Sequence, residues 1–283
     1  MKDFTVALCQ MTVKESKEEN LDKAVLMLRQ AARSGCQLAV LPEMFNCPYD
    51  QKRFPVYAET VPDGPTCRML TEAAAQNHIF IIGGSIPEKD ADGRIYNTAL
   101  AFAPDRGFTA RHRKVHLFDV DLETVKFRES AALTPGSGTT IFETPWARVG
   151  LAICYDVRFP DFFRLMAVEG AEVIVLPAAF NRVTGAAHWE ITMRMRAIDN
   201  QVYMVGVSPA ADFGAGYVAY GHSMAVDPWG RILAAAGDDE DLLIAALKAD
   251  ELERVRREFP LLLHRRSDLY EIRTVSPAPL HDA

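Results

Sequence analysis

The sequence predicts one α/β domain, and two observations support this fold class. Short apolar runs typical of buried strands alternate with amphipathic segments typical of helices along the whole chain. Hydrophobic residues make up 49% of the 283 residues, enough for a sizeable core, and no low-complexity linker or change in composition marks a boundary. We therefore expect a single domain over residues 1–283, with a C-terminal tail from about residue 267.

The first half of the chain opens with a strand, because apolar residues alternate over 4–8. Asn20 has the side chain and the position to cap the helix that follows. Gly83 and Gly84 are expected to interrupt a later strand. In order, we expect strands at 4–8, 38–41, 79–82 and 97–102, helices over 20–35 and 66–76, and a hairpin turn at 104–107.

The second half is expected to contain a buried strand over 149–153 that ends at Cys154, and a helix that begins at about Pro160. Asp250 is the expected cap of a final helix that ends near Pro260. Between them we expect a helix over 187–200, strands at 202–207, 222–226, 232–235 and 242–247, and a hairpin turn at 227–230.

A weak internal repeat links the two halves. A strand, a helix and a second strand ending in Val-Leu-Pro42 are followed, later in the chain, by a strand, a helix and a strand ending in Val-Leu-Pro177. Two similar halves and a coincidence between two ordinary strand–helix–strand units both explain this pattern. If the repeat is real, Glu43 and Ala178 lie at equivalent strand ends.

Composition excludes several classes of function. The 31 basic and 38 acidic residues give a net charge of −7, which disfavours nucleic acids and anionic membranes as partners. No apolar run approaches the roughly 20 residues that cross a bilayer, and the N-terminus lacks a signal-peptide pattern, so we expect a soluble cytoplasmic protein. Five cysteines without a Cys-x-x-Cys pair argue against a disulfide framework and a structural zinc site.

Cys154 is the main candidate for a reactive group. A thiol at the end of a buried strand is held firmly and can be approached by a substrate, although most such cysteines are simply small buried hydrophobic residues. A thiol needs a base or a nearby positive charge to react. A Cys-His mechanism is poorly supported, because neither the glycines of a nucleophile elbow nor a papain-like context surrounds Cys154.

A carboxylate and an ammonium are the alternative partners for the thiol. Glu43 follows an apolar strand and a proline, and Lys114 leads into an apolar turn, although either could equally be a solvated surface charge. A carboxylate can take the thiol proton, and an ammonium can stabilise an oxyanion. Composition and spacing alone do not bring these residues together.

Three separated segments resemble the nitrilase (carbon–nitrogen hydrolase) superfamily. They are Leu41-Pro-Glu43-Met-Phe, Arg113-Lys114-Val-His-Leu-Phe and Gly150-Leu-Ala-Ile-Cys154-Tyr-Asp-Val-Arg-Phe, in this order and at this spacing. The resemblance extends over essentially the whole chain. It is closest to the omega-amidase branch, through Phe45-Asn-Cys-Pro-Tyr49, His116-Leu-Phe-Asp-Val-Asp121 and Ala179-Phe-Asn181.

The resemblance implies a four-layer α-β-β-α sandwich, usually assembled as a homodimer, and no metal or organic cofactor. It implies that Cys154 is the nucleophile, Glu43 the general base and Lys114 the group that stabilises the oxyanion, helped by the backbone N–H that follows Cys154. Glu129 matches the second glutamate of the family, which orders the lysine and the substrate amide. A primary amide would then be hydrolysed through a thioester, with release of ammonia.

The expected substrates are small dicarboxylate monoamides such as 2-oxoglutaramate, 2-oxosuccinamate and succinamate. Candidate substrate-binding residues are Tyr49, His116, Tyr155, Asn181 and Arg182. The loop from Asn181 to Gly185 departs from the small, Thr-rich loop of omega-amidases, which leaves the substrate open. The alternatives are a sister amidase for deaminated glutathione or an N-carbamoyl amine, and a non-catalytic interaction module that keeps only the fold.

Overall fold

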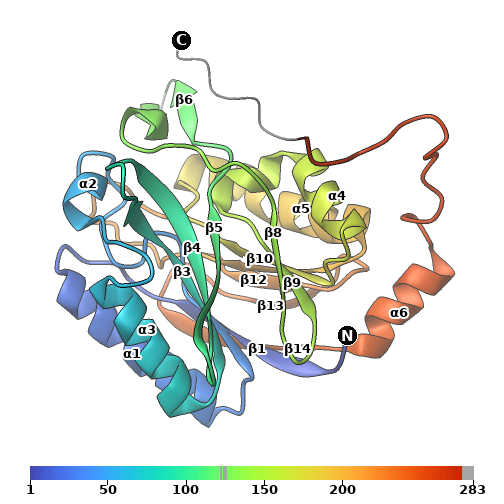
Figure 1. Ribbon diagram of the computed structural model, residues 1–283, viewed down its shortest axis with the longest axis horizontal. Helices are drawn as coiled ribbons and strands as arrows, with labels where there is room; N and C mark the ends of the chain where they lie inside the picture. Colours follow the sequence, from blue (N-terminus) through green and yellow to red (C-terminus); the bar gives the residue numbers. More distant parts are fainter. Residues whose placement is uncertain (122, 124–125, 276–283) are drawn as a thin grey trace.

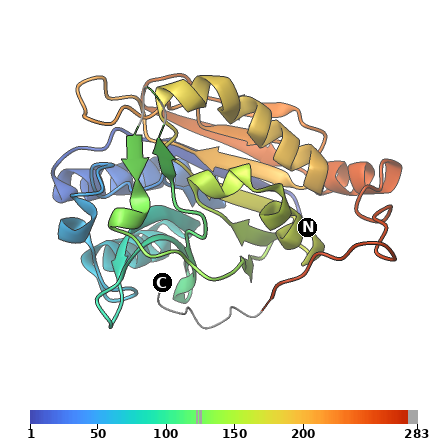
Figure 2. The ribbon, with the colours of Figure 1, turned by 90° about the horizontal axis from the view of Figure 1, so that it is seen from above.

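The computed structural model describes residues 1–121, 123 and 126–275, and it is a four-layer α-β-β-α sandwich (Figure 1). Two six-stranded sheets pack face to face, and pairs of helices cover their outer faces. Figure 2 shows the α5 layer above its sheet. The outer helices are α1 (Lys17–Arg33) and α3 (Pro65–Asn77) on one side and α4 (Pro160–Val168) and α5 (Arg182–Asn200) on the other.

The first sheet has the strand order β14-β1-β2-β3-β4-β5. Its three middle strands β1, β2 and β3 are parallel, and the other three are antiparallel to their neighbours. The hairpin predicted at 104–107 connects β4 to β5. The strands are β1 (Phe4–Gln10), β2 (Leu38–Val40), β3 (Phe80–Lys89), β4 (Ile95–Ala103), β5 (Gly107–Arg113) and β14 (Asp241–Leu247).

The second sheet has the order β13-β12-β11-β10-β9-β8. Here β9, β10 and β11 are parallel, and the remaining strands are antiparallel to their neighbours. The predicted hairpin around 227–230 connects β12 to β13. The strands are β8 (Thr140–Glu143), β9 (Arg148–Leu151), β10 (Val173–Pro177), β11 (Tyr203–Val207), β12 (Met224–Val226) and β13 (Ile232–Ala235).

The two sheets have the same topology, so the internal repeat is real. The unit β1-α1-β2 corresponds to β9-α4-β10, and each sheet adds one more parallel strand and then two antiparallel strands. The strand registers pair Leu8 with Val40 and Leu151 with Val175. Glu43 and Ala178 follow these two valines at the same distance along the chain, as the repeat predicts.

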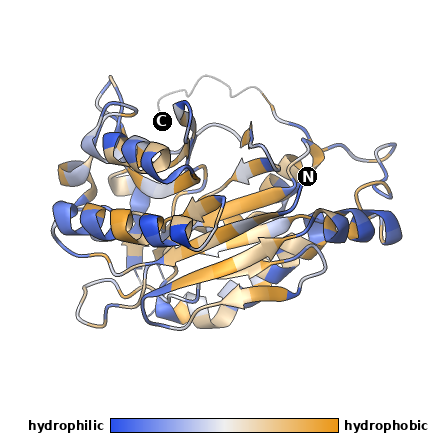
Figure 3. Ribbon diagram, turned by 90° about the horizontal axis from the view of Figure 1, so that it is seen from below, coloured by the Kyte–Doolittle hydropathy of each residue, from blue (hydrophilic) through white to orange (hydrophobic). Residues whose placement is uncertain are grey.

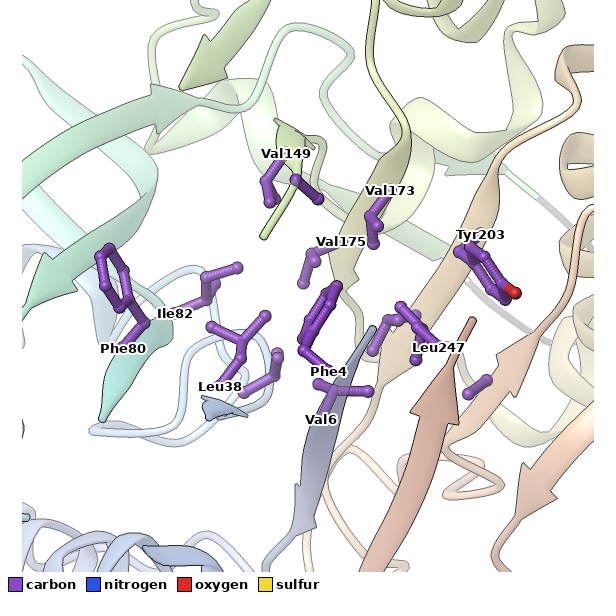
Figure 4. Close-up of a cluster of buried hydrophobic side chains, with 14 of the residues drawn as sticks. Phe4, Val6, Leu38, Phe80, Ile82, Val149, Val173, Val175, Tyr203 and Leu247 are labelled. Carbon is purple, nitrogen blue, oxygen red and sulfur yellow. The ribbon is translucent and has the colours of Figure 1, made fainter. Parts of the chain in front are cut away.

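The main core lies between the two sheets. Val6 on β1 faces the second sheet, where Val173 and Val175 of β10 belong to the same buried cluster (Figure 4). Ala7 and Cys9 point the opposite way, into a second cluster with α1 and α3. This alternation follows from the two-residue period of a strand. The strands are accordingly mostly hydrophobic in Figure 3, whereas the helices show two faces.

Helix α1 begins at Lys17, so the prediction that Asn20 caps it is wrong. Ser16 is the cap, and its Oγ accepts a hydrogen bond from the Glu19 N–H at 3.2 Å. The Asn20 side chain instead holds the preceding loop, through the N–H and the carbonyl of Lys14 at 2.7 and 2.8 Å. An asparagine near a helix start can either cap the helix or bond the backbone of the preceding loop. Here the loop backbone at Lys14 lies within reach of the Asn20 side chain.

Two other helix starts also differ from the prediction. Helix α5 begins at Arg182 rather than at 187, because the Asn181 side chain caps it by accepting the Thr184 N–H at 2.9 Å. Helix α6 (Ala249–Glu258) begins after Lys248, so Asp250 is not its cap. Asp250 lies in the first turn instead, where a negative charge interacts favourably with the helix dipole.

Gly83 and Gly84 interrupt the regular pairing of their strand, as predicted, but they do not end it. Strand β3 continues through both, and the register with β4 shifts between Ile82 and Ser85. Gly84 has φ of +55°, and a Cβ there would lie 2.0 Å from the carbonyl oxygen of Pro42. Only glycine therefore fits at this bulge, which packs against the residue immediately before Glu43.

The remaining elements are short and lie at the ends of the sheets. They are α2 (Phe54–Tyr57), the two-stranded hairpin of β6 (Asp119–Asp121) and β7 (Lys126–Arg128), and the 3-10 helices η1 (Glu129–Ala131) and η2 (Cys154–Arg158). Residues 267–275 of the expected tail form no helix or strand, and residues 276–283 lie outside the described part. Among the described residues, no helix is long and apolar enough to span a membrane.

Candidate active site

Four buried polar side chains come together where strands of both sheets end. Glu43 follows β2, Lys114 directly follows β5 and Cys154 follows β9. Glu129 opens η1 on the segment that leaves the β6–β7 hairpin. Glu43, Lys114 and Glu129 are 0% exposed, and Cys154 is 5% exposed. The structure thus brings together the four residues that the sequence singled out.

The Lys114 ammonium lies between two carboxylates. Its Nζ donates to Glu43 Oε1 at 3.0 Å and to Glu129 Oε1 at 2.9 Å. The other oxygen of Glu129 accepts the Phe118 N–H at 2.6 Å, which fixes that carboxylate. Burial alone would lower the pKa of Lys114, but the two carboxylates outweigh burial and raise this pKa above its ordinary value. Lys114 therefore stays charged.

The two oxygens of Glu43 have different surroundings. Oε1 accepts from Lys114, from Asn97 Nδ2 at 2.8 Å and, at 3.4 Å, from the Tyr49 hydroxyl. Oε2 is buried and has no hydrogen-bond partner within the described part of the chain. Because a buried carboxylate oxygen without a donor is unfavourable, Oε2 is an acceptor that is ready to take a proton.

Cys154 has a strained backbone. Its φ is +45°, in the left-handed region that residues with a Cβ rarely adopt. The residue lies between β9 and the 3-10 helix η2, so the chain makes a sharp strand-to-helix turn at the thiol. The sequence lacks the glycines of a nucleophile elbow, yet the backbone here makes a comparable turn. Strain of this kind is commonly found at functional sites.

Burial raises the pKa of the thiol and of its neighbouring carboxyl group. Burial raises the pKa of Cys154 well above its ordinary value, and the charge of Glu43 raises it further while Lys114 opposes the rise. Burial also raises the pKa of Glu43; Lys114 counteracts this, whereas Glu129 adds to it. The resting site therefore holds a neutral thiol beside an ammonium, rather than a preformed thiolate.

Three of the candidate substrate-binding residues line cavities at the site. Tyr49 lines the larger cavity and donates to Glu129 Oε1 at 2.9 Å. Tyr155 lines the smaller cavity, where its ring packs edge-on against Phe118. Asn181 lines both cavities, and its Nδ2 is buried without a hydrogen-bond partner among the described residues. The Asn181 amide can therefore donate to a ligand.

The other two candidates are engaged elsewhere. His116 Nδ1 lies 2.7 Å from Asp156 Oδ1, and its ring stacks on Phe159 at 3.7 Å between centroids. Arg182 pairs with Asp238 at 2.9 Å. Neither residue is among those that line the two cavities, so the structure does not bring them to the site.

Sequence reasoning missed four residues at or near the site. Asn97 bonds Glu43, and the Tyr217 ring lies 4.6 Å from that of Tyr49. Arg158 lines the smaller cavity, and Asp156 bonds the loop beside Lys114. Asp156 and Arg158 lie within one of the three segments that carry the family resemblance, so the available signal was their position.

Two adjoining cavities give access to these groups. The larger one has a volume of about 880 Å³ and is lined by Glu43, Tyr49 and Phe127 among others. The smaller one contains Cys154, and Ala179, Asn181 and Tyr217 line both. Within the described residues, no group of His, Cys, Asp and Glu side chains is arranged to hold a metal ion. The polar groups gathered at the site are a thiol, two carboxyl groups and an ammonium.

The fold and this site define a class. The carbon-nitrogen hydrolase family model matches residues 5–257, so the chain belongs to that family. It is a hydrolase that acts on the carbon–nitrogen bonds of amides.

Similar proteins include a named omega-amidase and two members with solved structures. Omega-amidase NIT2 of Bos taurus is 47% identical over 96% of this chain and 98% of its own length. The crystal structure of Saccharomyces cerevisiae Nit3, a nitrilase superfamily member, is 38% identical with a TM-score of 0.87, over 94% of this chain and 97% of that chain. The structure of an amidase from Nesterenkonia sp. AN1, a Glu-to-Gln mutant with the acetamide moiety of fluoroacetamide added covalently at the active-site cysteine, is 26% identical with a TM-score of 0.78, over 94% of this chain and 95% of that chain.

The Glu43→Gln variant tests the electrostatics of the site. Because the negative charge of Glu43 raises the pKa of Cys154, removing it while Lys114 stays charged should lower that pKa. We expect the pH midpoint of Cys154 alkylation by iodoacetamide, followed by intact-mass spectrometry, to fall by about one unit or more. Amide turnover should fall by about 10² to 10⁴-fold, because the general base is lost.

Glu59→Gln is the matched control for this experiment. Glu59 is 7% exposed and pairs with Lys17 at 2.7 Å, but it is not among the charges that set the pKa of Cys154. This variant should leave the alkylation midpoint unchanged. A midpoint that rises in Glu43→Gln, or moves equally in both variants, would contradict the electrostatic account.

Proposed function

We propose that the chain hydrolyses the primary amide of small dicarboxylate monoamides, such as 2-oxoglutaramate, 2-oxosuccinamate and succinamate, to an acid and ammonia. The observation that supports this proposal most directly is the unpartnered Oε2 of Glu43 in a site that also holds Lys114 and Cys154. Relatives that are 45–47% identical over nearly the whole chain are named omega-amidases, which supports the substrate class.

In the first half of the proposed reaction, Cys154 Sγ attacks the amide carbon as its proton passes to Glu43 Oε2. The carbonyl oxygen gains the negative charge, and Lys114 Nζ and the Tyr155 N–H stabilise it. The carbon–nitrogen bond then breaks, and Glu43 returns the proton to the leaving nitrogen, so that ammonia departs. The acyl group remains on Cys154 as a thioester.

In the second half, water replaces ammonia. Glu43 takes a proton from the water, and the oxygen attacks the thioester carbon at the same oxyanion site. The carbon–sulfur bond breaks, the acid is released and the proton returns to Cys154 Sγ. Glu129 keeps Lys114 in place throughout, since it contacts the ammonium at 2.9 Å and is itself held by the Phe118 N–H.

Arg158 is the proposed partner of the substrate carboxylate. It lines the smaller cavity together with Cys154, and its guanidinium lies over the Phe180 ring at 4.9 Å. Its Nη1 contacts His188 Nδ1 at 3.1 Å, and no carboxylate pairs with it among the described residues. Asn181, whose Nδ2 has no partner there, is a second donor for an acid or 2-oxo group.

A larger acyl group is the second candidate. The larger cavity has a volume of about 880 Å³, which is in the range that drug-sized ligands occupy. This volume is well beyond what a five-carbon amide fills. This volume favours a sister amidase that acts on deaminated glutathione or a similar substrate, by the same chemistry at the same residues.

The substrate class is tested by measuring ammonia release from 2-oxoglutaramate, succinamate, deaminated glutathione and an N-carbamoyl amine. We expect turnover of the first two, and a succinyl adduct on Cys154 when the succinamate reaction is quenched and analysed by mass spectrometry. The Cys154→Ala protein should show neither. Turnover of deaminated glutathione alone would replace the first candidate by the second.

Arg158→Gln should weaken binding of anionic substrates only. Losing a charge-assisted contact costs about 1.5–3 kcal/mol, so we expect KM for succinamate to rise by roughly 10- to 100-fold while KM for neutral butyramide stays unchanged. Arg182→Gln is the control, because Arg182 pairs with Asp238 and lines neither cavity. If KM for succinamate instead rose selectively in the Arg182→Gln protein, Arg158 would not be the partner of the substrate carboxylate.

The homodimer that the family resemblance implies has a candidate surface on α5. Ile191 and Met195, one helical turn apart, are 63% and 42% exposed. We propose that a second copy of the chain covers them, because exposed apolar side chains on neighbouring turns favour burial.

Sedimentation equilibrium should show a dimer that the Ile191→Glu substitution weakens. Leu26→Glu is the control, because Leu26 lies on α1 in the opposite helical layer, and this variant should leave the dimer intact. A monomeric wild-type protein would refute this.

A further inference from the structure

Asp156 is a fully buried carboxylate that the proposed reaction does not use. It lies on η2, two residues after Cys154, and it is 0% exposed. A buried charge is unfavourable unless donors surround it, so its contacts indicate what it is for.

Both oxygens of Asp156 accept hydrogen bonds from segments that carry reacting groups. Oδ1 accepts the His116 backbone N–H at 2.9 Å and lies 2.7 Å from His116 Nδ1. Oδ2 accepts the Ile153 N–H at 2.9 Å and lies 3.4 Å from His112 Nε2. We call this set of contacts the Asp156 clasp.

The clasp connects two segments that no strand pairing holds together. His112 and His116 lie on either side of Lys114, which follows β5 of the first sheet. Ile153 immediately precedes Cys154, which follows β9 of the second sheet. Among the described residues the two sheets share no backbone ladder, so contacts such as those of Asp156 help to set the position of the ammonium relative to the thiol.

We infer that Asp156 is a positioning residue that fixes Lys114 relative to Cys154, an inference that rests on the roles proposed above for those two residues. Displacing a reacting group by about 1 Å can reduce turnover by about 10²-fold, so the clasp acts on rate rather than on substrate affinity.

The charge state and the packing of the clasp support this role. Burial alone would raise the pKa of Asp156, but hydrogen bonds from His112 and His116 outweigh burial and hold the pKa well below its usual range. The carboxylate therefore stays an acceptor at neutral pH. The His116 ring is held from its other side by stacking on Phe159, which restricts the loop beside Lys114 further.

Asp156→Asn tests the inference, because asparagine keeps the shape but replaces one acceptor by a donor. We expect kcat for succinamate to fall by about 10- to 100-fold, with KM within about threefold of wild type. After burial, the charges of Glu43 and Lys114, rather than that of Asp156, affect the pKa of Cys154 most. A displaced Lys114 should therefore raise the pH midpoint of Cys154 alkylation, a change that a purely structural role would not produce.

Asp227→Asn is the matched control. Asp227 is a 3% exposed carboxylate that accepts the Trp229 and Arg231 N–H groups at 2.9 and 2.8 Å in the β12–β13 turn. The Asp227→Asn protein should lose as much thermal stability as the Asp156→Asn protein. It should keep the wild-type kcat and the wild-type pH midpoint of Cys154 alkylation. An Asp156→Asn protein with kcat within threefold of wild type, or two variants with equal losses, would overturn the inference.

A second pair of variants tests the inference if the Asp156→Asn protein does not fold. His116→Asn keeps a donor where Nδ1 lies and should retain most of kcat, whereas His116→Phe keeps the stacking but loses the donor and should not. Equal kcat in the two proteins would overturn the inference. If the wild-type protein hydrolyses none of the amides, the proposed function fails, while the alkylation midpoint, which needs no substrate, still decides the role of the clasp.

Discussion

The site depends on one ammonium group buried between two carboxylates. Removing Lys114 would leave two buried carboxyl groups without their shared ammonium partner, and leaving a buried charge unpaired costs several kcal/mol. Burial and the charge of Glu43 raise the pKa of Cys154, so the thiol keeps its proton in the resting site although Lys114 opposes the rise. In the proposed reaction, Glu43 can therefore act as base only when an arriving carbonyl accepts the developing charge.

The repeated fold explains where this cluster lies. Each half of the chain brings the carboxyl ends of its parallel strands to the same region, yet only one member of each equivalent pair carries chemistry. Glu43 corresponds to Ala178, and by the same registers Cys154 corresponds to Met11. The proposed base comes from one half and the proposed nucleophile from the other. Neither half alone contains the site, so the contact between the sheets is part of the active site.

Much of the fold and the central residues could be predicted from the sequence. Strand periodicity and glycine and proline positions located most elements, the three family segments located Glu43, Lys114 and Cys154, and the wider family resemblance located Glu129. The predicted helix starts were wrong where a side chain can either cap a helix or bond a neighbouring loop, as at Asn20. The cavity position of Arg158 could not be predicted, because local sequence does not show which side chain faces a cavity and which, like Arg182, pairs with a carboxylate elsewhere. The Asp156 contacts escaped because His116 is 40 positions away in the chain.

The left-handed backbone at Cys154 also has an evolutionary consequence. Glycine adopts φ of +45° without steric cost, whereas a residue with a side chain holds strain of about 1–3 kcal/mol there. A glycine at position 154 would therefore relieve this strain while removing the proposed nucleophile. A relative with glycine there would keep the architecture and lose the proposed chemistry.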